Sequence, residues 1–359
     1  MIKVRPAREG DHAAWQDFLA ATGCGDFLHD WAWADVAAFD GQPQRRFMVE
    51  EDDSLVAIVA AQVRRLPMQR SFWYVPHGPV LDYDHPHAAD RVRAVAIGLR
   101  EAARRERAIA VKLEPRVERG SRQESLFRRL RHEPSTLQVG QTRLVELTDD
   151  ESLLAGFDKD TRYAVRRAER EGVTVTTVSD AGDLRAIDDL HALVMETQRR
   201  AGFPKPQLQR YRTAWRGLAS ADRATIFEAR LGQRLMASAM LVIEGDRSFY
   251  LFSGSVREEP GEPKRYASYA LQWAMMRHAR DAGVRIHDLW GVAPEYATPD
   301  HPWYGVGLFK KGFGGRAVEW AGSWDVVVDP TLYRLRKLAE AGRSLLSGLA
   351  RRIRHPRDR

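Results

Sequence analysis

Residues 224–246, ATIFEARLGQRLMASAMLVIEGD, contain two apolar runs separated by a turn at Leu231-Gly232-Gln233. Two strand-sized apolar runs joined by a short turn with glycine predict a β-hairpin. The helix expected upstream, at 181–200, has an acidic first turn and a basic last turn, which suits the helix dipole. The other elements expected in this half are strands at 173–179, 248–255 and 284–292 and a helix at 266–283. The resulting order is strand, helix, hairpin, strand, helix, strand.

The first half of the chain repeats this order of elements. Its hairpin is RFMVEEDDSLVAIVAAQVRRL at 46–66, and its other elements are strands at 2–7, 71–80 and 109–115 and helices at 11–22 and 88–107. The repeat indicates internal duplication of an α/β domain of about 150 residues. We therefore expect one domain at 1–147, a second at 148–333 and a tail at 334–359.

The composition is that of an ordinary soluble globular protein. Of 359 residues, 44% are hydrophobic and 29% are charged. The longest apolar runs, at 55–63 and 235–243, are too short to span a membrane, and the N-terminus lacks the apolar core of a signal peptide. A single cysteine, Cys24, excludes an internal disulfide and a cysteine metal cluster. These features predict a cytoplasmic protein.

The excess positive charge is confined to the tail. The whole chain carries a net charge of +7, and residues 334–359 hold nine basic residues against Glu340 and Asp358, which also gives +7. Leucines and Ile353 recur there at helical spacing opposite the basic residues. Such a basic amphipathic helix is typical of contact with an anionic membrane surface. The alternatives are a helix packed on the body of the protein with a frayed basic end, or a contact with tRNA.

The segment GLFKKGFGG, at 307–315, is the most unusual in composition. Lys310 and Lys311 lie between two phenylalanines and four glycines, so we expect partial burial and close approach of the backbone. A lysine held in this way can neutralise negative charge that develops on a reacting oxygen. The alternative is a turn between two strands with solvated lysines.

Several motifs along the chain resemble, in order, those of the FemABX family, the non-ribosomal peptidyltransferases that build peptidoglycan cross-bridges. The resemblance covers residues 27–333. Its motifs are WAWADV (31–36), VPHGPVLD (75–82), KLEP (112–115), TRLVEL (142–147), TRYAVRRAEREGV (161–173), FYLFSGS (249–255), YALQWAMMRHARDAG (269–283), HDLWGV (287–292) and FKKGFGG (309–315). The family implies two tandem N-acetyltransferase-like (GNAT) domains, in agreement with the duplication.

The resemblance also implies a reaction without a metal, a cofactor or a covalent intermediate. An amine of a muramyl-pentapeptide, linked to lipid or to UDP, attacks the ester carbonyl of an aminoacyl-tRNA. Lys310 matches the family's lysine and is expected to stabilise the oxyanion or the departing ribose oxygen, with Phe309 as its aromatic neighbour. Glu114, where relatives commonly carry aspartate, could accept the amine proton; the alternative is a solvated strand-end carboxylate. Tyr250 could position the acceptor, or could be a core aromatic.

The chain departs from the family pattern where relatives hold the acceptor diphosphate. The segment WADVAAF, at 33–39, has no lysine, and AGFPKPQLQRY, at 201–211, offers Lys205 or Arg210 as the phosphate ligand. Phe252 also replaces an expected tyrosine. These departures leave the transfer chemistry in place and bear on the identity of the acceptor.

The helix at 161–171 carries Arg162, Arg166 and Arg170 on one face, and this face, with Arg162 and Arg166 as the candidate ligands, could bind tRNA phosphates; the alternative is a solvated charged face. His191, His278 and His287 lack metal-ligand spacing and are expected to be structural.

Two other functions compete with aminoacyl transfer. One is an acyl-CoA-dependent N-acyltransferase on the same fold, although the chain shows no basic, glycine-spaced loop of the kind that binds pyrophosphate. The other is an inactive relative that serves as a scaffold at the membrane, against which the intact FKKGFGG argues.

Overall fold

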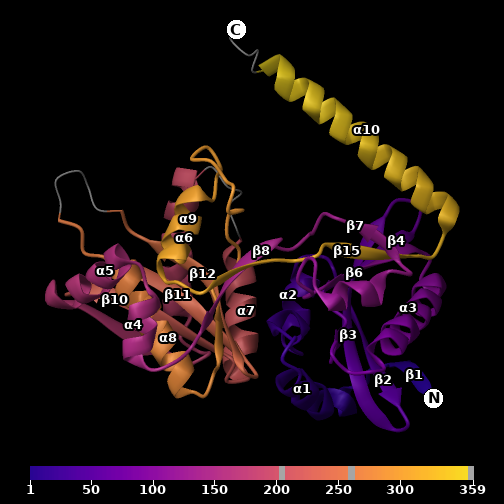
Figure 1. Cartoon of the computed structure of the whole chain (residues 1–359), viewed down its shortest axis with the longest axis horizontal. Coiled ribbons are helices and arrows are strands. Elements are labelled where there is room, and N and C mark those ends of the chain that lie inside the picture. The colour runs from indigo at the N-terminus through magenta and orange to yellow at the C-terminus, as the bar shows by residue number, and fades with distance from the viewer. Residues whose placement is uncertain (202–206, 258–262, 355–359) are drawn as a thin grey trace.

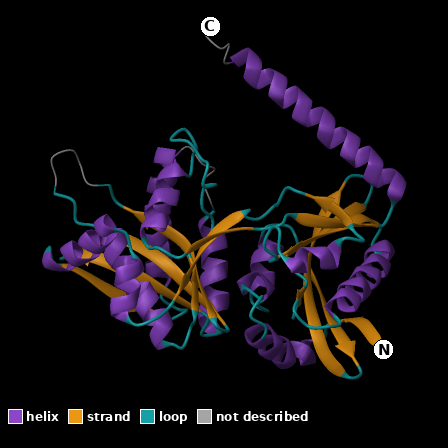
Figure 2. Ribbon diagram, viewed as in Figure 1, coloured by secondary structure: helices purple, strands orange, loops and turns teal. Residues whose placement is uncertain are grey.

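The computed structural model describes the backbone of residues 1–201, 207–257 and 263–354. Two lobes lie side by side, and each contains a β-sheet flanked by helices (Figures 1 and 2). A long C-terminal helix, α10 (Pro330–Arg354), extends away from the first lobe.

The first sheet has the strand order β1-β2-β3-β4-β6-β15-β7, with β5 paired to β3. Only β4 and β6 pair in parallel in this sheet as described. Its strands are β1 (Ile2–Pro6), β2 (Gln44–Glu51), β3 (Ser54–Leu66), β4 (Arg70–His77), β5 (Val80–Leu81), β6 (Ala108–Pro115), β7 (Arg131–Glu133) and β15 (Ser323–Val327). The helices of this lobe are α1 (His12–Ala21), α2 (Trp33–Phe39), α3 (Ala88–Arg105) and the short 3-10 turns η1 (Glu9–Asp11), η2 (Phe27–His29) and η3 (Arg122–Phe127).

The second sheet has the order β14-β8-β13-β12-β11-β10-β9. Its strands are β8 (Gln141–Glu146), β9 (Val173–Val178), β10 (Ala224–Leu231), β11 (Arg234–Glu244), β12 (Arg247–Ser255), β13 (Ile286–Asp288) and β14 (Arg316–Glu319). The helices around it are α4 (Asp150–Gly156), α5 (Lys159–Arg170), α6 (Leu184–Ala201), α7 (Leu208–Ser220), α8 (Ala267–Asp281) and α9 (Tyr304–Gly312).

Both expected hairpins are present. Strands β10 and β11 close at Leu231↔Arg234, and Gly232 in the turn has φ +57°, a conformation that glycine adopts without strain. Strands β2 and β3 close at Glu51↔Ser54, and the turn residues Asp52 and Asp53 both have positive φ. Positive φ at both central residues matches the twist of a two-residue hairpin, and Asp tolerates it better than most residues.

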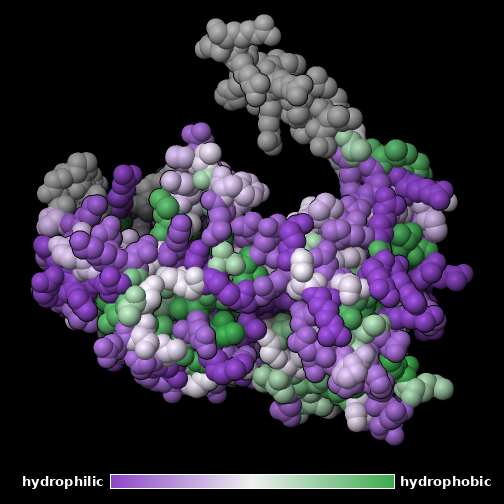
Figure 3. Space-filling view, in the orientation of Figure 1, coloured by the Kyte–Doolittle hydropathy of each residue, from purple (hydrophilic) through white to green (hydrophobic). Residues whose placement is uncertain are grey.

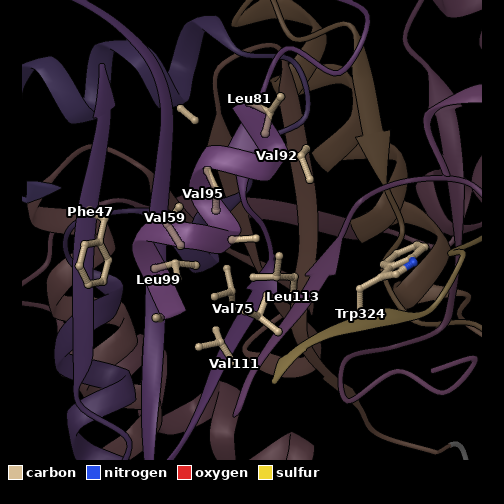
Figure 4. Packing of buried hydrophobic residues seen from close by; sticks show 14 of the residues in the cluster. Phe47, Val59, Val75, Leu81, Val92, Val95, Leu99, Val111, Leu113 and Trp324 are labelled. Atoms are coloured by element: carbon tan, nitrogen blue, oxygen red, sulfur yellow. The ribbon is translucent and has the colours of Figure 1, made fainter. Parts of the chain in front are cut away.

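Each lobe has its own apolar core. In the first lobe, Val92, Val95 and Leu99 of α3 pack against the inward side chains of β3, β4 and β6 (Figure 4). Burying each such aliphatic side chain contributes roughly 1.5–3 kcal/mol. A third apolar cluster joins the lobes, because residues of η2 and α2, such as Phe27 and Trp33, pack with Trp215 of α7.

The two sheets divide the chain differently from the expected ranges 1–147 and 148–333. Strand β8 lies in the second sheet, between β13 and β14, and β15 lies in the first sheet, between β6 and β7. Trp324 explains the placement of β15, since its side chain is buried in the first core and stacks on Phe127 at 4.8 Å. The chain therefore crosses between the lobes twice (Figure 1).

The tail helix begins at Pro330 rather than Arg334, and its first turns pack on the first lobe. Tyr333 is buried there, and the Arg336 guanidinium lies 3.8 Å from the centre of the Phe72 ring. The apolar and basic side chains expected beyond Gly342, including Leu345 and Arg351, lie outside the described side chains. Among the described helices, none combines the length and the apolar character that crossing a membrane requires.

Candidate functional site

Lys310 lies near the end of α9 and is buried, with 7% of its surface exposed. Its Nζ donates a hydrogen bond of 2.8 Å to the carbonyl oxygen of Gly291 and lies 5.5 Å from the centre of the Tyr250 ring. The alternative of solvated lysines in a turn between strands is therefore wrong for Lys310. The neighbouring Lys311 is exposed.

The glycines of FKKGFGG let the end of α9 pack closely on its neighbours. A Cβ atom at Gly312 would overlap Oγ1 of Thr161, and one at Gly314 would overlap the carbonyl of Gly156. Gly314 also has φ +73°, which favours glycine. The segment thus needs glycine for contact with α4 and α5, and this contact fixes the helix that carries the lysine.

Burial lowers the pKa of Lys310 to about 8, and the charge of Asp288 partly opposes this shift. At neutral pH the amine is therefore mostly protonated, although it lies in an apolar setting where its charge interacts strongly. His287 lies nearby, and burial lowers its pKa to about 4. Its two ring nitrogens lie 2.7 Å from Ser248 Oγ and 2.6 Å from Gln272 Nε2, so His287 is a buried, hydrogen-bonded imidazole.

Asp288 holds the backbone that contacts Lys310. It accepts hydrogen bonds from the side chain of Thr142 and, at 2.8 Å, from the backbone N–H of Trp290. Trp290 has φ +58°, which is strained for a bulky residue, and its ring packs 5.1 Å from Phe27. The carboxylate and the ring packing together maintain the turn that presents the Gly291 carbonyl to Lys310.

A buried charge network joins this turn to the first lobe. Arg116 Nη2 donates to Asp288 at 2.7 Å, and Arg116 Nη1 lies 3.5 Å from Asp26. Asp26 in turn contacts His77, and all four side chains are buried. Sequence reasoning missed both residues, although Arg116 directly follows the quoted motif KLEP and Asp288 lies within the quoted motif HDLWGV.

Glu114, on β6, is 2% exposed. Its carboxylate oxygens accept hydrogen bonds from the backbone N–H groups of Leu137, at 2.7 Å, and Gln138, at 2.8 Å. The alternative of a solvated strand-end carboxylate is therefore wrong. The loop that Glu114 fixes also contains Val139. The side chain of Val139 packs so closely on Gly291 that a Cβ atom at Gly291 would overlap it. This loop thus links Glu114 with the turn that holds Lys310.

Arg210, on α7, borders a cavity of about 260 Å³ between the lobes. Its guanidinium pairs with Asp40 at 3.0 Å and lies within 6 Å of the rings of Trp33 (5.8 Å) and Phe252 (5.9 Å). The cavity is also lined by Arg64, Gln138 and Trp290. It therefore lies between the loop fixed by Glu114 and the turn beside Lys310. Lys205 lies outside the described residues.

Tyr250 and Phe309 both lie close to Lys310. Tyr250 belongs to the core of the second lobe and also lies beside Lys310, so its position fits both a core aromatic and a residue that positions the acceptor. Burial raises the pKa of its hydroxyl. Phe309 is half-buried, with its ring 5.0 Å from that of Tyr269.

The two arginines expected to bind tRNA have different surroundings. Arg162 donates to carbonyl groups at the end of α4, including that of Ala155 at 3.2 Å, so it caps that helix. Arg166 is exposed on α5. In the part of the chain that is described, no three His, Cys, Asp or Glu side chains are grouped as metal ligands.

Comparison with known proteins identifies relatives along most of the chain. The sequence model of the FemAB family matches residues 11–137 and 219–341. The chain is 23% identical to the lipid II:glycine glycyltransferase of Staphylococcus saprophyticus, over 89% of this chain and 92% of that protein. It is 24% identical to the UDP-N-acetylmuramoylpentapeptide-lysine N(6)-alanyltransferase of Weissella viridescens, over 89% of this chain and 94% of that protein.

Solved structures support the fold. A crystal structure of FemX matches with a TM-score of 0.82 at 20% identity, covering 93% of this chain and 99% of that one. A tandem GNAT protein from the clavulanic acid pathway matches with a TM-score of 0.52 at 13% identity, covering 91% and 99% of the two chains. The expected fold, two GNAT-like domains in tandem, is thereby confirmed.

Proposed function

Since the chain belongs to the FemAB family, whose model matches more than half of it, we propose that it transfers an amino acid from aminoacyl-tRNA to a peptidoglycan precursor. The enzyme class expected from the sequence, an aminoacyltransferase, is confirmed by relatives named as a glycyltransferase and an alanyltransferase. The acceptor that we propose is the side-chain amine of a muramyl-pentapeptide linked to lipid or to UDP. The buried ammonium of Lys310 carries this proposal.

In the proposed reaction the acceptor amine attacks the carbonyl carbon of the ester on the tRNA. A C–N bond forms, and the carbonyl oxygen takes up the negative charge. Lys310 is protonated at neutral pH and supplies positive charge to that oxygen or to the departing ribose oxygen. A buried donor of this kind commonly contributes about 3–4 kcal/mol to the transition state. The C–O bond of the ester then breaks, and the ribose hydroxyl takes a proton as it leaves.

Glu114 remains our candidate for accepting the proton of the attacking amine. Two backbone amides hold its carboxylate beside the loop that borders the cavity between the lobes. For the acceptor's diphosphate we propose Arg210, with Lys205 as the second candidate. Arg210 is paired with Asp40, so the diphosphate would take the place of that carboxylate. Tyr250 and Phe309 complete the surroundings of the amine and the ester.

We also propose that the tail, residues 334–359, contacts an anionic membrane on its cytoplasmic side. Leu335 and Leu338 are 57% and 69% exposed, whereas Lys337 is bound to Glu133 of the first lobe at 3.0 Å. The first turns of α10 thus direct leucines outward. Deleting 334–359 should abolish sedimentation with anionic vesicles and leave turnover of a soluble acceptor intact.

The test of the main proposal uses purified protein, radiolabelled aminoacyl-tRNAs, and lipid-linked and UDP-linked muramyl-pentapeptide in parallel. We expect label to move from tRNA to at least one precursor, and Lys310→Ala to abolish the movement. Label that remains on tRNA with both acceptors, together with consumption of acetyl-CoA, would instead identify an acyl-CoA-dependent enzyme.

A further inference from the structure

One side of α5 carries three cations that no other part of the described structure engages. Lys159, Arg166 and Arg170 are exposed, and none of them takes part in a hydrogen bond or an ion pair within the described part of the chain. They are spaced by seven and four residues, so they share one face of the helix. The other basic residues of α5 are engaged: Arg162 caps α4, and Arg167 pairs with Glu171 at 2.6 Å.

These three cations border a hollow of about 570 Å³ along α5, together with Arg162, Tyr163 and Glu169. The surface over α5 is mainly hydrophilic (Figure 3). One carboxylate, that of Glu169, lies among four basic residues, so the hollow is strongly positive. A surface of this kind is complementary to a polyanion.

The start of α5 lies against the end of the helix that carries Lys310. The backbone N–H of Asp158 donates to the carbonyl of Gly312 at 2.8 Å, and the rings of Phe157 and Phe313 lie 5.2 Å apart. The row of cations therefore begins beside α9 and runs away from it for about 16 Å, at 1.5 Å per residue.

A series of aromatic rings connects the basic hollow to Lys310. Tyr163, on α5 between the cations, is 47% exposed, and its ring lies 6.1 Å from that of Tyr266. Tyr266 lies 5.9 Å from Tyr269, and Tyr269 lies 5.0 Å from Phe309, which directly precedes Lys310. Tyr266, Tyr269 and Phe309 are half-buried, so each ring keeps part of its surface accessible.

We propose that this surface binds the 3′ end of the donor RNA, with the α5 cations on its phosphates and the rings under its bases. The inference rests on the proposed function and names residues that hold the donor. Cations that follow a backbone, with aromatic rings on which bases stack, are the usual means of binding single-stranded nucleic acid. An RNA end that follows the rings inward brings its terminal ribose ester to Lys310.

RNA fits this surface better than a membrane does. A membrane-binding helix exposes large apolar side chains beside its cations, so that they enter the lipid. The aromatic rings here are instead half-buried and lead toward the interior of the second lobe, where a flat bilayer cannot follow.

The first test replaces the three cations together, as Lys159→Gln, Arg166→Gln and Arg170→Gln. Its matched control replaces Arg93, Arg100 and Arg104 by Gln. These three arginines have the same spacing, are exposed on α3 at the opposite end of the molecule (Figure 1), and take part in no hydrogen bond or ion pair within the described structure. Both variants lose three positive charges, so they differ only in where the charges were.

The measurement is the dissociation constant of full-length deacylated tRNA between 50 and 200 mM salt. On a single strand each phosphate contact adds about 0.7 to the slope of log affinity against log salt, so three contacts weaken binding roughly 20-fold over this range. We expect the α5 variant to lose that part of the salt dependence and the α3 variant to keep it. In transfer assays the α5 variant should show a raised KM for aminoacyl-tRNA with little change in kcat.

The second test concerns stacking. We expect Tyr163→Ala to weaken binding of the RNA end roughly tenfold, since one base stacked on one ring has about that effect. Tyr296→Ala, at a tyrosine that is 83% exposed elsewhere, is the control and should bind as the wild type does.

The outcomes separate this inference from the proposed function. If the wild type transfers from tRNA and the α5 and α3 variants bind it equally, the inference is wrong and the function stands. If the α5 variant instead loses binding to anionic vesicles and keeps its tRNA affinity, the surface faces a membrane. If the wild type neither binds nor uses any aminoacyl-tRNA, both proposals are wrong.

Discussion

Replacing Lys310 by Met tests the central claim, that a charged lysine is held in a site that disfavours its charge. Methionine has a similar length and no charge. The variant should be inactive in transfer. It should also change stability in a way that depends on pH, because the native and unfolded states bind the proton of Lys310 with different affinity.

The size of the effect follows from the pKa of Lys310, which burial lowers from 10.5 to about 8. In the folded protein the charged form is disfavoured by about 3 kcal/mol, at about 1.4 kcal/mol per pH unit. The wild type bears this cost below pH 8, where the lysine is charged in both states. Above pH 8 the folded protein loses the proton first, so its stability rises, and the cost disappears once the unfolded state is neutral as well.

The gain from methionine is partly offset. The carbonyl of Gly291 loses its hydrogen bond from Nζ, and an unsatisfied buried acceptor costs about 1–3 kcal/mol. This loss does not vary with pH. The informative quantity is therefore the change with pH: the free energy of unfolding of the variant minus that of the wild type should fall by about 2.5 kcal/mol between pH 7 and 10.

The assay is urea unfolding, followed by tryptophan fluorescence, of wild type and variant at pH 7, 8.5 and 10. Subtracting one protein from the other removes the titration of all groups that they share. Lys311→Met is the control, since that lysine is exposed, and its difference from wild type should be constant. A constant difference for Lys310→Met as well would refute the claim that burial disfavours the charge of Lys310.

Three further predictions follow. The single-turnover rate of the wild type should fall about tenfold per pH unit above pH 8, as Lys310 loses its proton, when measured with preloaded aminoacyl-tRNA. Burial raises the pKa of Glu244 from 4.5 to about 8, because it favours the neutral carboxyl group. The contribution of this neutral group to the free energy of unfolding is full below pH 4.5 and is lost as pH rises through 8. Glu244→Gln should therefore gain about 3 kcal/mol over wild type between pH 5 and 8 in urea unfolding. Arg116→Met should destabilise by about 3–5 kcal/mol, since Asp26 and Asp288 lose their buried partner; an unchanged midpoint would contradict this.

The order of elements could be predicted from the sequence because it depends on local signals. Strand-sized apolar runs and turn residues such as Gly232 mark the hairpins, and helical spacing marks α5, α6 and α8. The surroundings of the lysine in GLFKKGFGG could also be predicted in part, since its glycines and aromatics indicated a partly buried lysine held close to the backbone. Its helix was not foreseen, because α9 is fixed by contacts with α4 and α5 rather than by its own residues.

The rest of the candidate site depends on partners that are distant in sequence. Arg116 and Asp288 are 172 residues apart, and no local pattern pairs them. Glu114 binds two backbone amides, which every residue except proline has, so nothing in the sequence marks its partners. The exchange of β8 and β15 was missed for the same reason: a short apolar strand can extend either sheet, and the buried side chains of the whole fold decide which one.

That exchange bears on how a duplicated fold acquires a single site. Two independent copies would place their sheets in separate lobes, joined by one linker and free to separate. Here the first half of the chain contributes β8 to the second sheet, and the second half contributes β15 to the first sheet. In addition, Arg116 of the first lobe neutralises Asp288 of the second. Asp288 in turn holds the turn that contacts Lys310. The geometry around the lysine therefore requires both lobes in their present arrangement, and neither half of the chain could provide it alone.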